Sequence, residues 1–306
     1  MSDTIYPAVG TPPRTEPDSI GAGGEINFPY REAGYAKPAA AAAPAPATAH
    51  VPVAPSAPVG FGADLPPWPD IDFSEFGATE VRPVSRIQKL VGSFLSRNWV
   101  TIPHVTHHDE AEVDALEAYR KGRNAAGGEV KLTALVFMVK AVVKALQAYP
   151  QFNASLDASG KNLIYKKYFH IGVAVDTKFG LLVPVLRDCD KKSVAELAVE
   201  LAALSNKART KGLSLPEMSG GCFSISSLGG IGGTSFTPIV NAPEVAILGL
   251  SKTQPKPFPG PAGEVLWRQM QPLSLSYDHR VINGADAARF TQHLATLLAN
   301  PEALAE

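Results

Sequence analysis

The chain has 306 residues, of which 45% are hydrophobic and 19% charged, and its formal net charge is -1. This composition is that of a globular protein with one sizeable core, or two, since domains commonly contain about 150 residues. The near-zero charge excludes the basic field that binding to nucleic acid or to an anionic membrane surface requires. The sequence has neither an apolar run of the roughly 20 residues that span a bilayer nor a signal-peptide pattern, so we expect a cytoplasmic protein.

Residues 1–65 are dominated by proline, alanine and glycine. They offer too little large apolar surface to offset the entropy of ordering the backbone, about 1 to 2 kcal/mol per residue. Prolines recur every few residues and argue against an alanine-rich helix. We therefore predict a disordered linker over residues 1–65 and one α/β catalytic domain over residues 66–306.

Three helices are predicted further along the chain. Thr133 precedes a strongly apolar helix that stops near Pro150. Ser193 and Glu196 have the spacing of a capping box, which opens a second helix. A last helix is expected over residues 285–298, ahead of an Asn-Pro pair.

Five strand-like runs lie between these helices, at residues 170–176, 181–186, 222–226, 245–250 and 273–277. Helices and strands interleave without a regular βαβ alternation. The pattern therefore predicts a mixed β-sheet covered by helices, an α/β (α+β) fold, and disfavours a Rossmann or barrel topology.

The two cysteines, Cys189 and Cys222, are far apart and each lies in an apolar run. They provide neither a disulfide framework nor a CxxC pair for metal or redox chemistry. We expect both to be thiols of the hydrophobic core.

One histidine occupies a position suited to catalysis. His279 follows the last predicted strand and precedes Asn283-Gly284, a dipeptide that commonly turns the chain. A pKa near 6.5 leaves most of an imidazole neutral at pH 7 and able to accept a proton. A lone histidine in such a turn is more often structural, so the assignment depends on its surroundings.

Those surroundings carry a resemblance. Residues 279–284, His-Arg-Val-Ile-Asn-Gly, resemble the HxxxDG signature of the chloramphenicol acetyltransferase-like superfamily. The longer string 273–285 is similar to the catalytic domain of the 2-oxo acid dehydrogenase acyltransferase (E2) family. Further blocks resemble the same family in the same order, at residues 95–106, 172–184, 220–229 and 238–249. The resemblance implies the chloramphenicol acetyltransferase-like fold. Within the family, the sequence most resembles pyruvate-type, acetyl-transferring bacterial members.

The resemblance also implies a reaction and its residues. Members move an acetyl group from the dihydrolipoyl thioester of a lipoyl domain to coenzyme A, with no metal. His279 would be the general base for the thiol, and Ser226 the donor to the oxyanion. Ser227 would point to the opposite face of a strand and is the weaker candidate. Asn283 replaces the commoner aspartate of the signature, so its role would be hydrogen-bond orientation or loop structure. The residues that contact coenzyme A are not implied.

Competing sites have weaker support. The run Gly229-Gly-Ile-Gly-Gly233 lacks the GxGxxG spacing and is not followed by a helix opening, which disfavours a dinucleotide site. His104, His107 and His108 lie close together, yet no carboxylate or cysteine set completes a metal site. We expect them to be hydrogen-bonded or solvated histidines beside a β segment. No GxSxG motif supports a serine hydrolase.

The resemblance implies an assembly as well. The family builds trimers with the active site between neighbouring subunits, works with E1 and E3 components, and in bacterial pyruvate-type members forms a 24-subunit cubic core. Lipoyl and subunit-binding domains would precede the catalytic domain, and residues 1–65 resemble neither. We therefore expect the acyl donor to arrive on a lipoyl domain in trans, or on one missing from this chain. The chain finishes with a charged residue, Glu306, where the family has an apolar end, which predicts a weaker contact between trimers.

Two other functions stay open. The chain could be a non-catalytic E2-like scaffold that only assembles partner subunits, although a scaffold has no need of both His279 and Ser226. It could also acetylate a small hydroxyl or amine acceptor, which would use the same histidine.

Overall fold

The computed structural model describes residues 69–127, 130–178 and 180–305, all of which belong to one compact unit. The predicted linker over residues 1–65 lies outside the described residues. The boundary placed at residue 66 therefore stays a prediction.

The centre of the fold is a seven-stranded sheet in the order β1-β11-β9-β8-β4-β7, with β10 paired to β11. Its strands are β1 (His104–Glu112), β4 (Ile171–Val173), β7 (Val185–Leu186), β8 (Phe223–Ser227), β9 (Ala246–Leu250), β10 (Gln254–Pro259) and β11 (Val265–Asp278). β8 runs parallel to β4 and to β9, whereas the other pairs are antiparallel. The predicted sheet of mixed direction is confirmed.

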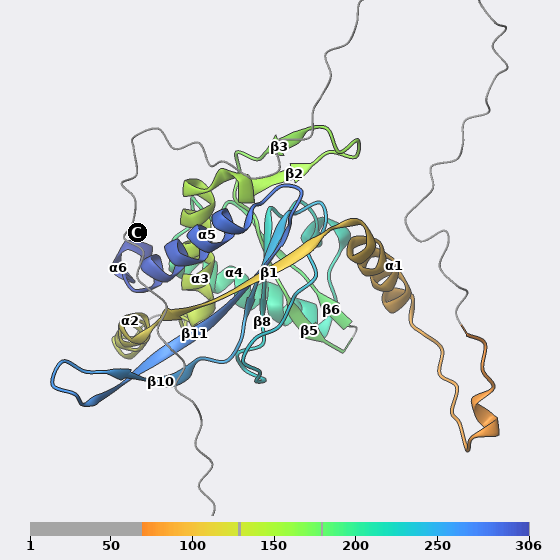
Figure 1. Cartoon of the computed structure of the whole chain (residues 1–306), viewed down its shortest axis with the longest axis horizontal. Helices are drawn as coiled ribbons and strands as arrows, with labels where there is room; N and C mark the ends of the chain where they lie inside the picture. Colours follow the sequence, from red (N-terminus) through yellow and green to blue (C-terminus); the bar gives the residue numbers. More distant parts are fainter. Residues whose placement is uncertain (1–68, 128–129, 179, 306) are drawn as a thin grey trace, which may run out of the picture. The chain divides into compact units, whose positions relative to one another are not determined.

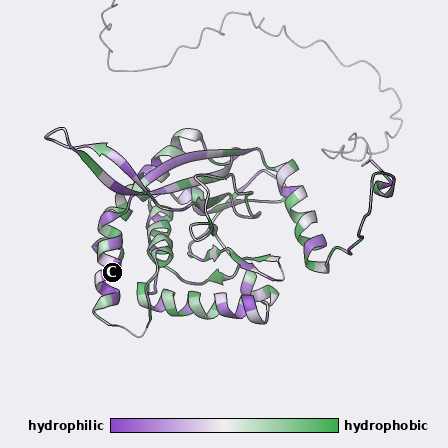
Figure 2. Ribbon diagram, turned by 90° about the horizontal axis from the view of Figure 1, so that it is seen from below, coloured by the Kyte–Doolittle hydropathy of each residue, from purple (hydrophilic) through white to green (hydrophobic). Residues whose placement is uncertain are grey.

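Three long helices lie together on one side of this sheet, as Figure 2 shows. They are α3 (Ala134–Ala148), α4 (Val194–Thr210) and α5 (Gly284–Leu298). The predicted capping box opens α4, because Ser193 Oγ accepts from the Glu196 amide at 3.2 Å and Glu196 Oε2 accepts from the Ser193 amide at 2.8 Å. All three predicted helices are confirmed within about one turn.

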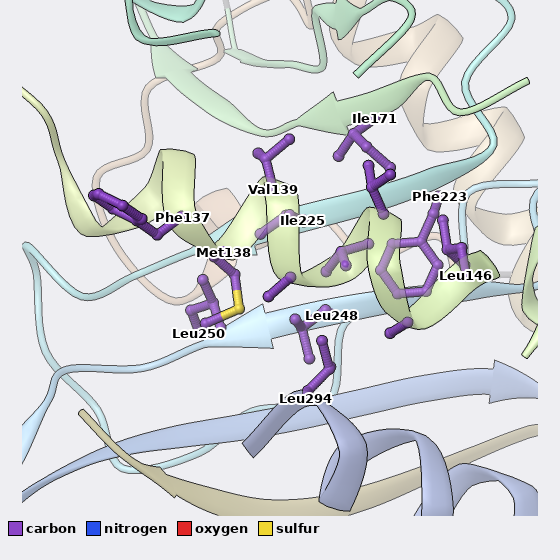
Figure 3. Close-up of a cluster of buried hydrophobic side chains, with 14 of the residues drawn as sticks. Phe137, Met138, Val139, Leu146, Ile171, Phe223, Ile225, Leu248, Leu250 and Leu294 are labelled. Carbon is purple, nitrogen blue, oxygen red and sulfur yellow. The ribbon is translucent and has the colours of Figure 1, made fainter. Parts of the chain in front are cut away.

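The main core fills the space between the helices and the sheet. Apolar side chains of α3 point toward those of the central strands and of α5 (Figure 3). The fully buried rings of Phe290, on α5, and Phe152 stack with centroids 4.2 Å apart. Cys189 and Cys222 are both buried free thiols, as predicted, and burial raises the pKa of Cys189 to about 12. The core positions β11, and therefore the turn that follows it.

Two of the predicted strands are each interrupted. The run 170–176 divides into β4 and β5 (Val175–Thr177), and the run 181–186 divides into β6 (Gly180–Leu182) and β7. Pro184 has no amide hydrogen and cannot donate to a neighbouring strand. Its carbonyl still accepts from the Val173 amide, at 2.9 Å. The chain therefore leaves the main sheet here, and β5 and β6 form a two-stranded sheet of their own.

The remaining elements were not predicted from the sequence. They are η1 (Phe73–Glu75), α1 (Arg86–Thr101), α2 (Asp114–Ala125), η2 (Pro150–Asn153), β2 (Ala154–Leu156), β3 (Leu163–Tyr165), η3 (Leu215–Met218) and α6 (Glu302–Ala305), together with β1 and β10. Figure 1 shows α1 leading into β1 at one end of the sheet, and the β10–β11 hairpin at the opposite end. β1 escaped prediction because it is an edge strand rich in polar residues and has no apolar alternation.

Candidate active site

The candidate base is the first residue after the long strand β11. The His279 amide donates to the Pro103 carbonyl at 3.0 Å, so its backbone is tied to the residue before β1. Its side chain is exposed in the single chain, and its ring centroid lies 5.8 Å from that of Tyr277. The imidazole is therefore held at the end of the sheet from which it can face another molecule.

The neighbours of His279 form an ion pair that closes the turn. The side chain of Asp278 is buried, and it accepts from Arg280 Nε at 3.0 Å and Nη2 at 2.7 Å. The Arg280 amide also donates to Asp278 Oδ1 at 3.0 Å. The hydrogen bonds that the Arg280 guanidinium donates to Asp278 raise the pKa of that guanidinium. Because both flanking side chains are committed to each other, the backbone of His279 has little freedom.

Asn283 is at the far side of the same turn. It is the N-cap residue of α5, and its carbonyl accepts from the amides of Asp286 and Ala287, each at 3.0 Å. Its side chain makes no capping hydrogen bond and is exposed. The amide group is therefore available to contact an imidazole or a substrate at this turn.

Ser226 lies elsewhere in the sheet. It pairs with Gly249 on β9, which pairs with Ser274 on β11. His279 follows Ser274 by five residues, and the row crosses two strand-to-strand spacings, from β8 to β9 and from β9 to β11. At about 3.3 Å per residue and about 4.8 Å per strand, the backbones of Ser226 and His279 are roughly 19 Å apart. One chain therefore does not bring the two predicted residues together.

The two serines of β8 face opposite sides of the sheet, as the alternation of a strand predicts. Ser227 is in register with Leu250 and Leu273, on the helix-covered side. It also lines a cavity of about 390 Å³. Ser226 is on the other side, where the ring of Phe236 approaches Gly249 so closely that a Cβ there would lie 2.7 Å from it.

The cavity beside Ser227 is a feature that sequence reasoning missed. Its lining comes from α2, α3 and the ends of β8 and β9, and it includes Lys252 and the buried Ser251, whose hydroxyl has no hydrogen-bond partner. These residues are scattered along the chain without a motif, so no sequence signal identified them.

Glu244 is a second feature that the sequence did not reveal. Its side chain is buried, and Oε2 has no hydrogen-bond partner. Burial raises the pKa of this carboxyl from 4.5 to about 7. It is among the residues that line a cavity of about 1100 Å³ beneath α1. Nothing in the local sequence separates this glutamate from an ordinary surface residue.

Two histidines of β1, His104 and His108, are engaged in hydrogen bonds. Both ring nitrogens of His104 contact backbone atoms, and His108 Nδ1 lies 3.0 Å from the Ser274 hydroxyl. Within the described part of the chain, no three His, Cys, Asp or Glu side chains gather as a metal site would need. In the same residues, no helix is long and apolar enough to cross a membrane.

Comparisons with known proteins agree on one family. The model of the 2-oxoacid dehydrogenases acyltransferase (catalytic domain) family matches residues 76–306. The chain is 54% identical over 245 residues to the dihydrolipoyllysine-residue acetyltransferase component of the pyruvate dehydrogenase complex of Haemophilus influenzae. The matched segment covers 79% of this chain and 43% of that protein. Three such curated relatives are matched over only 42% to 44% of their length, so this chain spans less than half of each.

Two solved structures have the same fold. One is the Azotobacter vinelandii dihydrolipoamide acetyltransferase, studied for the roles of a serine, a histidine and an asparagine in its catalytic mechanism. Its TM-score is 0.76 at 51% identity, over 78% of this chain and 99% of that one. The other is the cubic core of the pyruvate dehydrogenase multienzyme complex, with a TM-score of 0.76 at 52% identity and the same coverage. The expected acyltransferase fold is confirmed.

Proposed function

Because this chain belongs to the 2-oxoacid dehydrogenase acyltransferase family, we propose that it transfers an acetyl group between a dihydrolipoyl thioester and coenzyme A. The relatives that support the acetyl group are named as components of pyruvate dehydrogenase complexes. Coenzyme A is a substrate in this proposal, and the lipoyl group is carried by a lipoyl domain.

His279 acts as the general base in this proposal. A free thiol has a pKa of about 8.5 and is only a few per cent thiolate at pH 7, so a positioned base accelerates attack. The imidazole takes the proton of the coenzyme A thiol as its sulfur bonds to the acetyl carbon. When the tetrahedral intermediate collapses, the bond to the dihydrolipoyl sulfur breaks, and the imidazolium returns the proton to that sulfur.

Two further residues complete the site. Ser226 donates to the oxyanion of the intermediate, a contact worth about 3 kcal/mol in comparable sites. Asn283 orients the imidazole, which fits a side chain that α5 does not use as a cap. In the Azotobacter protein the histidine and asparagine under study are four positions apart, as His279 and Asn283 are here.

The observation that carries the proposal is the separation of about 19 Å between Ser226 and His279, from the sheet register. A general base and an oxyanion donor must both reach one carbonyl. The site therefore combines His279 of one copy with Ser226 of another, and the trimer expected of this family would supply that contact. A heterologous contact of this kind closes a trimer when the rotation is about 120°.

Mixed assemblies test the shared site. His279→Ala and Ser226→Ala proteins are expected to be nearly inactive alone. In randomly mixed trimers, roughly a quarter of the sites would combine the intact histidine of one variant with the intact serine of the other. Activity close to that fraction of wild type supports the proposal, and no recovery in verified mixed trimers contradicts a shared site.

The reaction itself is tested by acetyl exchange between acetyl-CoA and free dihydrolipoamide. His279→Ala should lower kcat by about 10²- to 10⁴-fold, whereas His107→Ala, a half-buried histidine of β1, should not. Equal rates for the wild type and His279→Ala would remove the base assignment. Absence of exchange in the wild type itself would favour the scaffold function.

The partners follow from the family and belong to the same proposal. We expect the trimer to work with E1 and E3 components in the bacterial cytoplasm. One relative of known structure is a cubic core, so a 24-subunit assembly is the natural extension.

A further inference from the structure

His104, one of the histidines left without a role by the sequence, uses both of its ring nitrogens. Nδ1 lies 2.8 Å from the Ile102 carbonyl, and the Val240 amide donates to Nε2 at 3.0 Å. A carbonyl needs an N–H opposite it, and an amide needs a lone pair. The contacts therefore select the neutral tautomer with its proton on Nδ1. Trp99 stacks on the ring at 5.5 Å and helps to fix its orientation.

These hydrogen bonds join two segments that are far apart in sequence. Ile102 follows α1, and Val240 lies in the loop that connects β8 to β9. Their side chains pack with Ile247 in a small apolar cluster separate from the main core. Asn98 Nδ2 also donates to the Val240 carbonyl at 3.0 Å, so both the amide and the carbonyl of Val240 are hydrogen-bonded to side chains.

The same two segments hold the backbone of the candidate base. The His279 amide donates to the carbonyl of Pro103, the residue before His104. The Asp278 amide donates to the carbonyl of Val245, at the end of the loop that contains Val240. His104 also pairs with Asp278 in the register of β1 and β11. His104 therefore ties together the two supports between which the His279 turn is held.

We propose that His104 is a positioning residue that fixes His279 for proton transfer, through the hydrogen bond from the Val240 amide to its Nε2. This inference rests on the proposed function, in which His279 is the base. His104 has no role in binding coenzyme A here, because both of its ring nitrogens are used by the protein. Its loss should therefore affect kcat and leave the KM for acetyl-CoA unchanged.

Three substitutions separate the contacts of the ring. His104→Phe keeps an aromatic ring against Trp99 and removes both hydrogen bonds. In His104→Gln the amide oxygen can still accept from Val240, whereas in His104→Asn the shorter side chain can reach only the Ile102 carbonyl. The control is His108→Phe, a change on the same strand as His104. It removes the contact of the ring Nδ1 with the hydroxyl of Ser274 on β11, four residues before Asp278.

The expected result is a decrease of roughly ten- to a hundredfold in kcat for His104→Phe at unchanged KM, since small misplacements of a catalytic group have effects of this size. His104→Gln should recover most of the loss and His104→Asn little of it. Amide hydrogen exchange over residues 278–283 should be faster in His104→Phe and unchanged in His108→Phe.

The proposal would be overturned if His104→Phe had the kcat and the amide hydrogen exchange of the wild type. It would also be overturned if His104→Phe and His108→Phe lost the same fraction of kcat. If His104→Phe does not fold, the pair His104→Gln and His104→Asn decides, and equal kcat in that pair overturns it. If the wild type shows no acetyl exchange, the proposed function fails on its own. The hydrogen-exchange comparison then still decides whether His104 holds the turn.

Discussion

Glu244 gives the protein a pH-dependent stability that can be calculated from its burial. Its pKa is about 7 in the folded chain, against 4.5 for the ordinary group, because the ionised carboxylate would be buried. The folded state therefore holds this proton over a pH range in which the unfolded state has released it. Below pH 4.5 the Glu244 carboxyl is protonated in both the folded and the unfolded state, so its titration does not lower the free energy of unfolding. The stability then falls as the pH rises from 4.5 to about 7, and it is constant above that range.

A difference of about 2.5 pKa units corresponds to roughly 3 kcal/mol, at 1.36 kcal/mol per unit. Glu244→Gln keeps the shape of the protonated acid and cannot ionise. We expect the variant and the wild type to unfold at similar urea concentrations at pH 4.5. At pH 8.5 the variant should be more stable by up to about 3 kcal/mol.

Urea unfolding of both proteins at equal subunit concentration measures this difference, since the stability of an assembly depends on concentration. Subtracting the two curves cancels the titration of all other groups, provided that they do not contact Glu244. Glu217→Gln is the control, because that carboxylate forms an ion pair with Lys207 at 2.6 Å and its pKa is lowered to about 2. A difference between Glu244→Gln and wild type that is the same at pH 4.5 and pH 8.5 would refute the reasoning.

Four further outcomes are expected. Asp278→Asn should weaken the pair with Arg280 and loosen the His279 turn. We expect a lower kcat in the acetyl exchange assay and a stability lower by about 1 to 3 kcal/mol. An unchanged kcat would show that the pair does not position the base. Phe290→Ala should destabilise the protein to urea by about 3 to 5 kcal/mol, because it leaves a cavity under α5. Ser193→Ala should cost about 1 kcal/mol by removing the cap of α4, with activity retained. Mass photometry at nanomolar concentration should detect trimers, and 24-mers alone would contradict the weaker contact between trimers.

The strongly patterned part of the fold could be predicted from the sequence. α3 follows from an uninterrupted apolar helix after Thr133, and α4 from the capping box at Ser193. β1 and α1 could not be predicted in this way. β1 carries polar residues at an edge of the sheet, and α1 has much of its apolar surface exposed in the single chain. Hydrophobic periodicity indicates an element when one face of it is buried in the core of its own chain. The signal is weak for an element that buries little of its surface in that core.

The sequence by itself identified the family, because the residues around His279 are contiguous and their order is specific. It also marked Asn283 and Ser226 as the companions of that histidine, which remain predictions. Only the tertiary structure decided where these residues lie. The sheet register separates Ser226 from His279 by roughly 19 Å, and the contacts of Pro103, Val240 and His104 hold the turn. Strand pairing and side-chain contacts join positions more than a hundred residues apart, and no local pattern encodes such distances.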